Sequence, residues 1–358
     1  MAASFVIAGR NNGFARADAR AAALASVTAY REAMAGFAQL PTMGIWYAHM
    51  PEDQLVKFVR DAVAEVAKEE KKAGKAKKNK AQRDGREEKT AREVARRAQK
   101  NLAKAHTRDS VQALSKLGEV VGGQYRIVSQ PPVIVPSRDL AGTFGLSPEE
   151  VVPALRDLFR AYRATLPDDR RRLLERFEIV DMARKVVGVG SVGTRAFIVL
   201  LAGRDAHDPL FLQVKEATAS VLEGYLPKSR YRQHGERVVQ GQQLMQAASD
   251  IFLGWTKGLD TTRHFYWRQL RDMKGSALVE LMAPITLTYY ARLCGWTLAR
   301  AHARSGDPVA IASYLGSDDA FDQSITAFSE RYADQNEQDY EAFVKAVRSG
   351  RLEAVEGV

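Results

Sequence analysis

The segment GVGSVGTRAFIVLLAG, residues 188–203, carries the strongest indication of the fold. Its first six residues form the pattern G-x-G-x-x-G, which several phosphate-binding loops share. In a dinucleotide-binding domain these glycines open a helix, but here Gly193 is followed by the strand-like run TRAFIVLLAG. A Walker A loop continues with Lys and then Ser or Thr, whereas Thr194 and Arg195 follow Gly193. Both classes are excluded, which leaves a glycine loop between two strands.

Such a loop is either a plain tight turn or the flap that protein kinases lay over the phosphates of ATP. The kinase arrangement requires a lysine on the next strand, and LFLQVKEA supplies Lys215, 22 residues after Gly193. It also requires a carboxylate to orient that lysine, for which Glu223 and Glu236 are candidates, while Glu216 belongs to the opposite strand face. Two further strands, DIFLGW and FYWRQL, then precede a helical region. This order favours the kinase arrangement, with these nucleotide-binding residues: Gly188, Gly190, Ser191, Gly193, Lys215 and Glu236.

The length and composition indicate a globular protein. The chain has 358 residues, of which 46% are hydrophobic, so it can bury a large core and form two or three domains. Its single cysteine, Cys294, excludes a disulfide scaffold and fits a reducing compartment. The sequence contains no window of 18 uninterrupted apolar residues and no cleavable leader pattern. We therefore expect a soluble, cytoplasmic protein without a transmembrane segment.

The net charge of +10 is concentrated in one segment. Residues 68–108 hold 16 Lys and Arg against six Asp and Glu, an excess equal to that of the whole chain. Because the segment has almost no large apolar residues, the pattern predicts a solvated basic helical hairpin over about residues 52–117. The alternative is a contact with nucleic acid or an acidic membrane, but the segment has no aromatic residue to stack on bases.

The hydrophobic pattern predicts an α+β protein with four regions. Residues 1–120 indicate a helical region, and residues 121–176 a connecting strand pair with helices. Residues 177–275 indicate a small antiparallel β lobe, and residues 276–358 a helical lobe. A long helix is expected from Ser276, kinked at Pro284. Three other helices are predicted over Ala17–Phe37, from Pro148 after an N-cap at Ser147, and over Arg230–Ala248.

Phosphoryl transfer also requires a positioning Asp, and an Asn and a second Asp that hold Mg²⁺. His302 and Asp307 only superficially resemble a catalytic loop, because no Asn follows at the required spacing. The acidic run at Asp318, Asp319 and Asp322 is interpreted as helix N-capping. The sequence therefore predicts residues that bind the nucleotide, but it assigns no metal ligand and no catalytic residue.

Several longer motifs resemble a known bacterial family, domain of unknown function 2252. They are VGVGSVGTRAFIVLL, LFLQVKEATASVL, QLMQAASDIFLGW, FYWRQLRDMKGS and CGWTLARAHARSGD, and the resemblance extends over essentially the whole chain. The resemblance implies a permuted protein-kinase-like fold similar to aminoglycoside phosphotransferases. It also implies that Gly188, Gly190, Gly193 and Lys215 lie on the nucleotide side. In the family, G-D-x-H-x-x-N and D-F-D segments precede the glycine loop, so here they would lie upstream of Met1.

Two functional hypotheses follow. The first is an ATP-binding, kinase-like phosphotransferase with an unknown small-molecule or protein acceptor, in which Mg²⁺ binds only if the missing segment is supplied. The second is a non-catalytic nucleotide-binding or interaction protein that contacts a polyanion through the basic hairpin.

Overall fold

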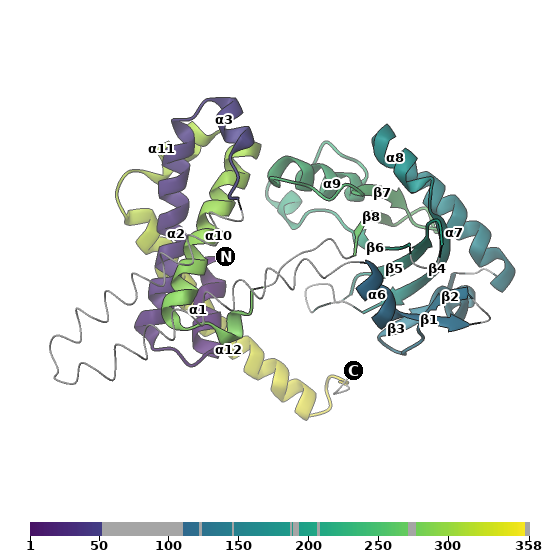
Figure 1. Ribbon diagram of the computed structural model, residues 1–358. Coiled ribbons are helices and arrows are strands. Elements are labelled where there is room, and N and C mark those ends of the chain that lie inside the picture. Colours follow the sequence, from purple (N-terminus) through teal and green to yellow (C-terminus); the bar gives the residue numbers. More distant parts are fainter. Residues whose placement is uncertain are drawn as a thin grey trace, which may run out of the picture. The chain divides into compact units, whose positions relative to one another are not determined.

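The computed structural model describes residues 1–51, 110–121, 124–144, 147–186, 188, 193–205, 208–270 and 277–354. The chain forms two compact units (Figure 1). Unit 1 comprises Met1–Ala103 and Gly275–Gly357, and unit 2 comprises Lys104–Lys274. The basic helical hairpin expected over about residues 52–117 lies outside the described residues, apart from the final helix α6 (Ser110–Leu117).

Unit 1 is helical. The first and last parts of the chain supply α1 (Ala2–Asn11), α2 (Arg16–Ala38), α3 (Thr42–Tyr47), η4 (Val279–Leu281), α10 (Pro284–Ser305), α11 (Pro308–Leu315) and α12 (Ala320–Arg348). The Ala-rich sequence of α2 favours a helix and presents a surface that another helix can approach closely. At the crossing with α10, a Cβ added to Gly295 would lie 2.2 Å from the carbonyl oxygen of Ser26. A glycine is therefore required at this position of α10.

The helix expected from Ser276 with a kink at Pro284 is not observed, and this prediction is wrong. Helix α10 begins at Pro284, and Ala283 before it is extended, with φ −77° and ψ 159°. Proline disfavours helical geometry in the residue before it, and its missing N–H costs nothing in the first helical turn. Pro284 therefore starts the helix and does not bend it.

Unit 2 is built on an antiparallel sheet of six strands in the order β3-β4-β5-β6-β8-β7. The strands are β3 (Ile134–Pro136), β4 (Glu178–Lys185), β5 (Ala196–Ala202), β6 (Pro209–Ala217), β7 (Gly254–Lys257) and β8 (His264–Gln269). A separate hairpin pairs β1 (Gly118–Val121) with β2 (Gln124–Ile127). Strands β5 to β8 overlap the runs TRAFIVLLAG, LFLQVKEA, DIFLGW and FYWRQL, and β4 lies within the predicted lobe of residues 177–275, so a small antiparallel sheet in this region is confirmed.

The helices of unit 2 are α6, α7 (Pro148–Arg163), α8 (Asp168–Leu174) and α9 (His234–Met245), with short helices η1 (Ser137–Phe144) and η3 (Val221–Gly224). Helix α7 starts as predicted, because Ser147 and Glu150 form a capping box and Pro148 occupies the first turn. Helix α9 lies within the range predicted for it.

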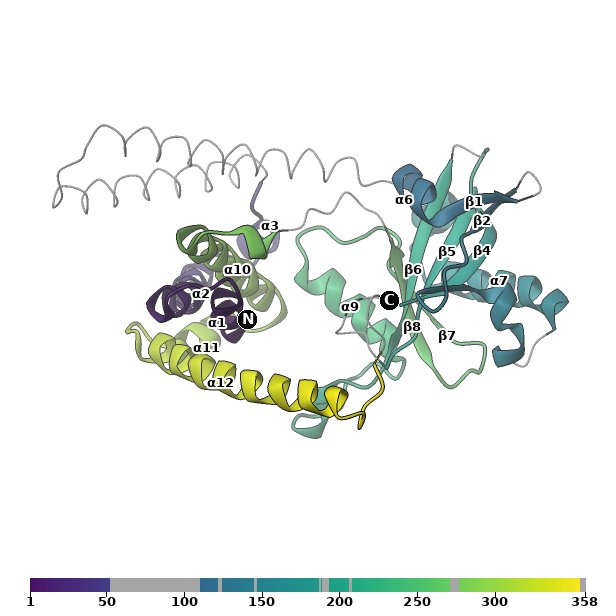
Figure 2. The same ribbon diagram turned by 90° about the horizontal axis from the view of Figure 1, so that it is seen from below.

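The two faces of the sheet carry different cores. Alternate residues of β6 point to opposite faces. Leu210, Leu212 and Val214 join Trp267 and α7 on one face, whereas Phe211 packs with α6 on the other. Figure 2 shows α6 and α9 on one side of the sheet and α7 on the other. Lys215 therefore lies on the α6 and α9 face.

Within the described parts of the chain, no helix combines the length and the apolar character that a membrane crossing requires.

Candidate functional site

The glycine-rich segment connects β4 to β5, two neighbouring antiparallel strands. This is the position between two strands that the sequence predicted for it. Gly188 and Gly193 lie near its two ends and are exposed, while Gly190 and Ser191 lie outside the described residues. Gly193 has φ +84°, in the left-handed region that any other residue adopts at a cost. The pattern thus places a glycine where the backbone needs one.

The end of this loop is tied to β6 by Arg195 and Glu216. The backbone N–H of Arg195 donates to the Glu216 carboxylate at 2.9 Å, and the N–H of Glu216 donates to the carbonyl oxygen of Arg195 at 2.8 Å. The guanidinium groups of Arg195 and Arg263 each lie 3.6 Å from the same carboxylate. Glu216 thus anchors the loop from the face opposite Lys215, and it is not the partner of that lysine.

Lys215 directly precedes Glu216 on β6. It pairs with Ala196 on β5 and with Tyr266 on β8, so only two residues separate its cross-strand partner from Gly193. The register brings the lysine to the end of the sheet where the glycine loop returns. A half-buried ammonium group therefore lies at the base of the loop, where an anion held by the loop could reach it.

The electrostatic surroundings of Lys215 are positive. Burial lowers the pKa of the ammonium group, and the nearby Arg268 guanidinium lowers it further. Arg268 lies on the same face, where its Nε donates to Gln213 at 3.2 Å. In the described part of the chain, the ammonium group of Lys215 has neither a hydrogen bond nor an ion pair. Two cations converge here without a carboxylate between them, which is a chemical environment suited to an anion.

Helix α9 is fixed to the sheet next to this position. The Gln233 side chain donates to the carbonyl oxygen of Thr256 at 2.6 Å, and the N–H of His234 donates to Nδ1 of His264 at 3.0 Å. A Cβ on Gly235 would lie 2.1 Å from the carbonyl oxygen of Phe265, so only glycine permits this close approach. These contacts place Glu236 in the first turn of α9, where a carboxylate is favoured by the helix dipole.

The predicted pairing of Lys215 with a carboxylate is not formed in the structure. Glu236 is half-buried and its backbone N–H is capped by Gln233 at 2.8 Å, while Glu223 lies in η3. Neither glutamate makes an ion pair with Lys215 within the described ranges. Of the predicted nucleotide-binding residues, the structure brings Gly193 and Lys215 to the same end of the sheet and leaves Glu236 on the adjacent helix.

The residues that superficially resembled a catalytic loop have structural roles in unit 1. His302 Nδ1 lies 2.9 Å from the hydroxyl of Tyr30, and Asp307 caps α11 by accepting from the N–H groups of Val309 and Ala310. Of the acidic run, Asp319 is the N-cap residue of α12 and Asp318 accepts from the N–H of Ala320. Asp322 is instead a buried partner of Arg31 and Thr28. Among the residues that the structure describes, no three His, Cys, Asp or Glu side chains form a metal-binding cluster.

Arg268, which lies beside Lys215 in the candidate site, was not identified from the sequence. The alternation in HFYWRQ contains the signal, because Phe265 and Trp267 belong to the core face and Tyr266 and Arg268 therefore belong to the other. Only the cross-strand register shows that this other face is the one that carries Lys215.

These features define an α+β protein with an antiparallel sheet, a glycine loop between neighbouring strands and a half-buried lysine beside it. The chain belongs to the family described as uncharacterized proteins conserved in bacteria (DUF2252), whose model matches residues 1–87 and 53–346. This match confirms the family resemblance of the sequence motifs. No curated protein and no solved structure matched the chain.

Proposed function

We propose that unit 2 binds the phosphates of ATP at Lys215, beneath the glycine loop, in the arrangement of a protein-kinase small lobe. The observation that carries this proposal is the position of Lys215, which is half-buried, lies beside Arg268 and has no carboxylate partner among the described residues. A structural lysine on a sheet is normally exposed or paired, because burial of an ammonium group is costly. A phosphate would compensate for that cost.

The order of the elements supports the same proposal. The glycine loop joins β4 to β5, Lys215 lies on the next strand, α9 follows, and β7 and β8 complete the sheet. In protein kinases a glycine-rich loop covers the phosphates, and a lysine on the third strand contacts them. In this protein the loop amides would contact phosphate oxygens from above, and Lys215 would contact them from the sheet. Arg268 would add a second positive charge on the same face.

Glu236 is the residue that we assign to orient the lysine. Its helix is held against β7 and β8, and it is half-buried in the first turn of that helix. Nucleotide binding would draw Lys215 and Glu236 together, because a carboxylate and a phosphate can share the three N–H groups of one ammonium. The described residues contain no ligand set for Mg²⁺, so no phosphoryl-transfer step is assigned to them.

The proposal is tested by titrating the whole chain with ATP in a calorimeter, with and without Mg²⁺. The Lys215→Met variant is expected to weaken binding by about tenfold or more, because a charge-assisted hydrogen bond contributes about 1.5–3 kcal/mol. Lys116→Met is the matched control, since Lys116 is an exposed lysine on α6 of the same unit. Binding that is equal in the wild type and in Lys215→Met would contradict the proposal, as would a folded wild-type protein that does not bind ATP.

A further inference from the structure

Two histidines join helix α9 to the sheet of unit 2. The backbone N–H of His234, the first residue of α9, donates to Nδ1 of His264 on β8 at 3.0 Å. A backbone N–H can only donate, so Nδ1 of His264 presents a lone pair and the neutral ring carries its proton on Nε2. A protonated ring has an N–H group at both nitrogens and cannot accept this bond. The contact therefore exists only with a neutral His264.

The ring of His234 carries a second nitrogen that lacks a hydrogen bond. Its centroid lies 5.0 Å from that of the His264 ring, and its Nδ1 is buried without a partner among the described residues. Buried polar atoms normally have a partner, so this nitrogen is an unused position beside His264. A neutral His264 accepts from the backbone of α9, whereas a protonated His264 has this nitrogen as the neighbouring acceptor.

The charged and titratable groups around the His264 ring are mostly cations. On the elements that pack against it they are Lys215 of β6, Lys257 of β7, Tyr266 and Arg268 of β8, and Glu236 and Arg237 of α9. Within the described ranges, Glu236 makes no ion pair with His264. Burial lowers the pKa of His264, and the neighbouring histidine ring and Lys257 lower it further. The bond to α9 is therefore present above about pH 6.5, the ordinary value, and is lost as the pH falls through the lowered one.

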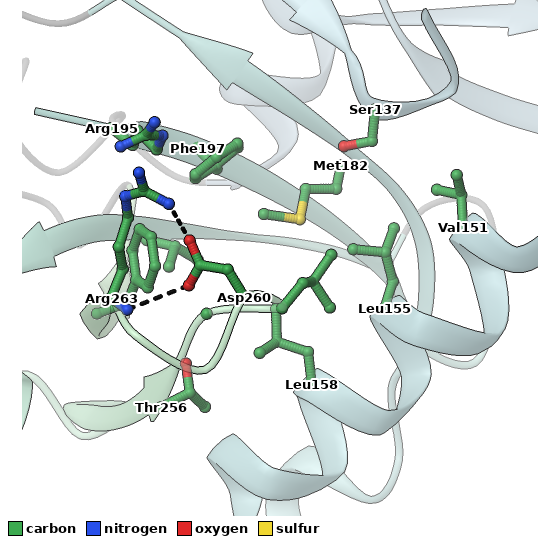
Figure 3. A pocket seen from close by; sticks show the side chains of 14 residues that line it. Ser137, Val151, Leu155, Leu158, Met182, Arg195, Phe197, Thr256, Asp260 and Arg263 are labelled. Carbon is green, nitrogen blue, oxygen red and sulfur yellow. Dashed lines mark hydrogen bonds and ion pairs between the residues drawn. The ribbon is translucent and has the colours of Figure 1, made fainter. Parts of the chain in front are cut away.

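The charged groups that precede His264 in the sequence lie on the other face of the sheet. Arg263 lines the cavity under α7, between Leu155 of that helix and the strands, and it binds Asp260 there (Figure 3). Arg195 lines the same cavity. Successive residues of a strand point to opposite faces, so the sheet separates these charges from the His264 ring.

From these observations we infer that His264 is a pH-sensitive contact of α9: the neutral ring holds the first residue of the helix against β8, and the protonated ring releases it. Gln233 and Gly235 hold the same end of the helix by contacts that do not titrate, so protonation loosens the first turn and does not unfold the helix. The consequence for the nucleotide rests on the proposed function. Because Glu236 lies in this turn, loosening it displaces the carboxylate that orients Lys215, and ATP binds more weakly at acid pH.

The contact is tested without nucleotide by hydrogen exchange of the whole chain at pH 7.5 and pH 5.0, with each rate corrected for the intrinsic effect of pH. In the wild type, the protection of the first turn of α9 is expected to fall by about fivefold to tenfold at pH 5.0, which corresponds to the loss of one hydrogen bond. His264→Asn retains an acceptor oxygen and does not titrate, so its protection should be equal at both pH values. His49→Asn, an exposed histidine of unit 1, is the matched control and should behave as the wild type.

Nitrogen-15 NMR of the wild type tests the same inference and is decisive where His264→Asn does not fold. At pH 7.5 the proton of the His264 ring is expected on Nε2. The amide signals of the first turn of α9 should titrate with the same midpoint as the ring, below about pH 6.5.

The consequence for the nucleotide site is measured by ATP titration at the same two pH values. A phosphate group takes up a proton at about pH 6, which affects the wild type and each variant alike. The wild type and His49→Asn should therefore lose several-fold more affinity on acidification than His264→Asn. If ATP binds at neither pH while α9 still loosens in acid, the proposed function fails and the contact stands. If α9 loosens but all three proteins lose affinity equally, the contact does not regulate the nucleotide site.

Three outcomes would overturn the inference. The first is that the first turn of α9 in the wild type is equally protected at both pH values. The second is that His264→Asn loses as much protection on acidification as the wild type. The third is that Nδ1 of His264 carries a proton at pH 7.5.

Discussion

Glu216 and Arg195 are joined by two hydrogen bonds, one to the Glu216 side chain and one between the backbones, that hold the end of the glycine loop to β6. The Glu216 carboxylate accepts from the N–H of Arg195 at 2.9 Å, and the N–H of Glu216 donates to the carbonyl oxygen of Arg195 at 2.8 Å. The side chain of Glu216 is only 11% exposed, although it carries a charge. Because Lys215 precedes Glu216, this contact fixes the distance between the loop and the lysine.

Replacing Glu216 is expected to destabilise unit 2. Glu216→Ala should lower the free energy of unfolding by about 2 kcal/mol, because a hydrogen bond to a charged group is lost. Glu216→Gln should cost less, since an amide oxygen can still accept from the Arg195 N–H. Equilibrium urea unfolding followed by circular dichroism measures both. Glu178→Gln, an exposed carboxylate on β4, should have no effect, and an equal loss in Glu178→Gln would contradict the role given to Glu216.

Tyr162 makes a buried hydrogen bond that stabilises the α7 face of the sheet. Its hydroxyl donates to the carbonyl oxygen of Phe252 at 2.6 Å, and its ring stacks on Trp267 with the centroids 4.4 Å apart. Tyr162→Phe keeps the stacking and leaves a buried carbonyl without its donor. We expect a loss of about 1–2 kcal/mol in urea unfolding. Tyr225→Phe is the control, because Tyr225 is 89% exposed.

The contribution of Tyr162 also has a defined pH dependence. Burial raises the pKa of its hydroxyl well above the ordinary value, and the nearby Asp250 carboxylate raises it further. The folded state therefore keeps a proton that the unfolded state releases above about pH 10. The advantage of the wild type over Tyr162→Phe should be constant below that pH and shrink above it, by about 1.4 kcal/mol per pH unit. A difference that does not change between pH 8 and 11 would show that this interpretation is wrong.

Asp322 is a fully buried carboxylate of unit 1, and its loss should destabilise that unit. Its side chain is fully buried, lies 3.0 Å from Arg31 Nη2 and accepts from the Thr28 hydroxyl at 2.8 Å. Asp322→Asn leaves the Arg31 guanidinium without its counter-ion, and we expect a loss of about 3 kcal/mol in thermal or urea unfolding. Asp339→Asn, an exposed position on the same helix, is the control.

A double variant distinguishes the effect of an unpaired buried charge from the effect of lost side-chain packing at Arg31 and Asp322. Arg31→Met with Asp322→Leu removes both charges, so it should recover much of the stability lost in Asp322→Asn. If the double variant is less stable than the single one, the buried pair contributes more than mutual neutralisation, and the present account fails.

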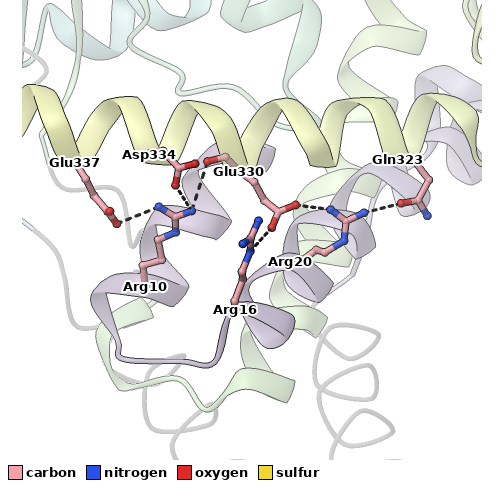
Figure 4. Close-up of polar contacts among 7 residues, drawn as sticks. All are labelled: Arg10, Arg16, Arg20, Gln323, Glu330, Asp334 and Glu337. Carbon is pink, nitrogen blue, oxygen red and sulfur yellow. Dashed lines mark hydrogen bonds and ion pairs between the residues drawn. The ribbon is translucent and has the colours of Figure 1, made fainter.

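The ion pairs between α12 and the first two helices are expected to weaken at acid pH. Glu330 receives hydrogen bonds from Arg16 and Arg20, and Arg10 binds Asp334 and Glu337 on the same helix (Figure 4). Burial opposes the ionisation of Glu330, but the two arginines outweigh it, so its pKa lies below the ordinary value. A lowered pKa means that the stabilisation is present above the unfolded value, about 4.3, and is lost as the pH falls through the folded one.

Glu330→Gln is expected to lower the free energy of unfolding by about 1 kcal/mol at pH 7, since the arginines are partly exposed and solvent screens the pairs. The difference from the wild type should shrink as the pH falls below the unfolded value of about 4.3, and it should disappear only when the pH is below the lowered folded pKa, where Glu330 is protonated in both states. Unfolding curves from pH 3 to pH 7 measure it. A difference that grows on acidification would have the wrong sign for this mechanism.

The sequence predicted the order of the elements better than their boundaries. Each strand from β4 to β8 was predicted, because β-branched and aromatic runs bounded by glycine and aspartate are a local signal. The start of α10 was not, because the apolar pattern continues through Ala283 and Pro284, and only the backbone restriction of proline decides where the helix begins.

The geometry of the candidate site could be predicted from the sequence less completely than the fold. Gly193 and Lys215 were predicted because their spacing along the chain has a local meaning. Arg268 and the cavity under α7 depend on which strands are neighbours, and α7 lies far from β8 in the sequence. A contact of this kind is set by tertiary packing, which period-two alternation within one strand does not specify.

The partly buried ammonium group of Lys215 is expected to lower the free energy of unfolding of the free protein. Burial and the Arg268 charge lower the pKa of its ammonium group, so the folded state binds that proton less tightly than the unfolded state. Lys215→Met should therefore raise the free energy of unfolding at pH 7, by about 1 kcal/mol or less because solvent screens a half-exposed charge. The gain should shrink as the pH rises toward about 10.4, where the lysine is neutral in both states.

This expectation separates a functional lysine from a structural one. A structural lysine is retained because it stabilises the fold, so its replacement would destabilise the protein. A lysine that is kept for a ligand is expected to lower the stability of the free protein. Removing it should therefore stabilise the fold and, at the same time, weaken the binding of ATP. Urea unfolding and ATP titration on the same Lys215→Met sample measure both quantities. A variant that is less stable than the wild type would assign Lys215 to the fold and would remove the principal support for the nucleotide site.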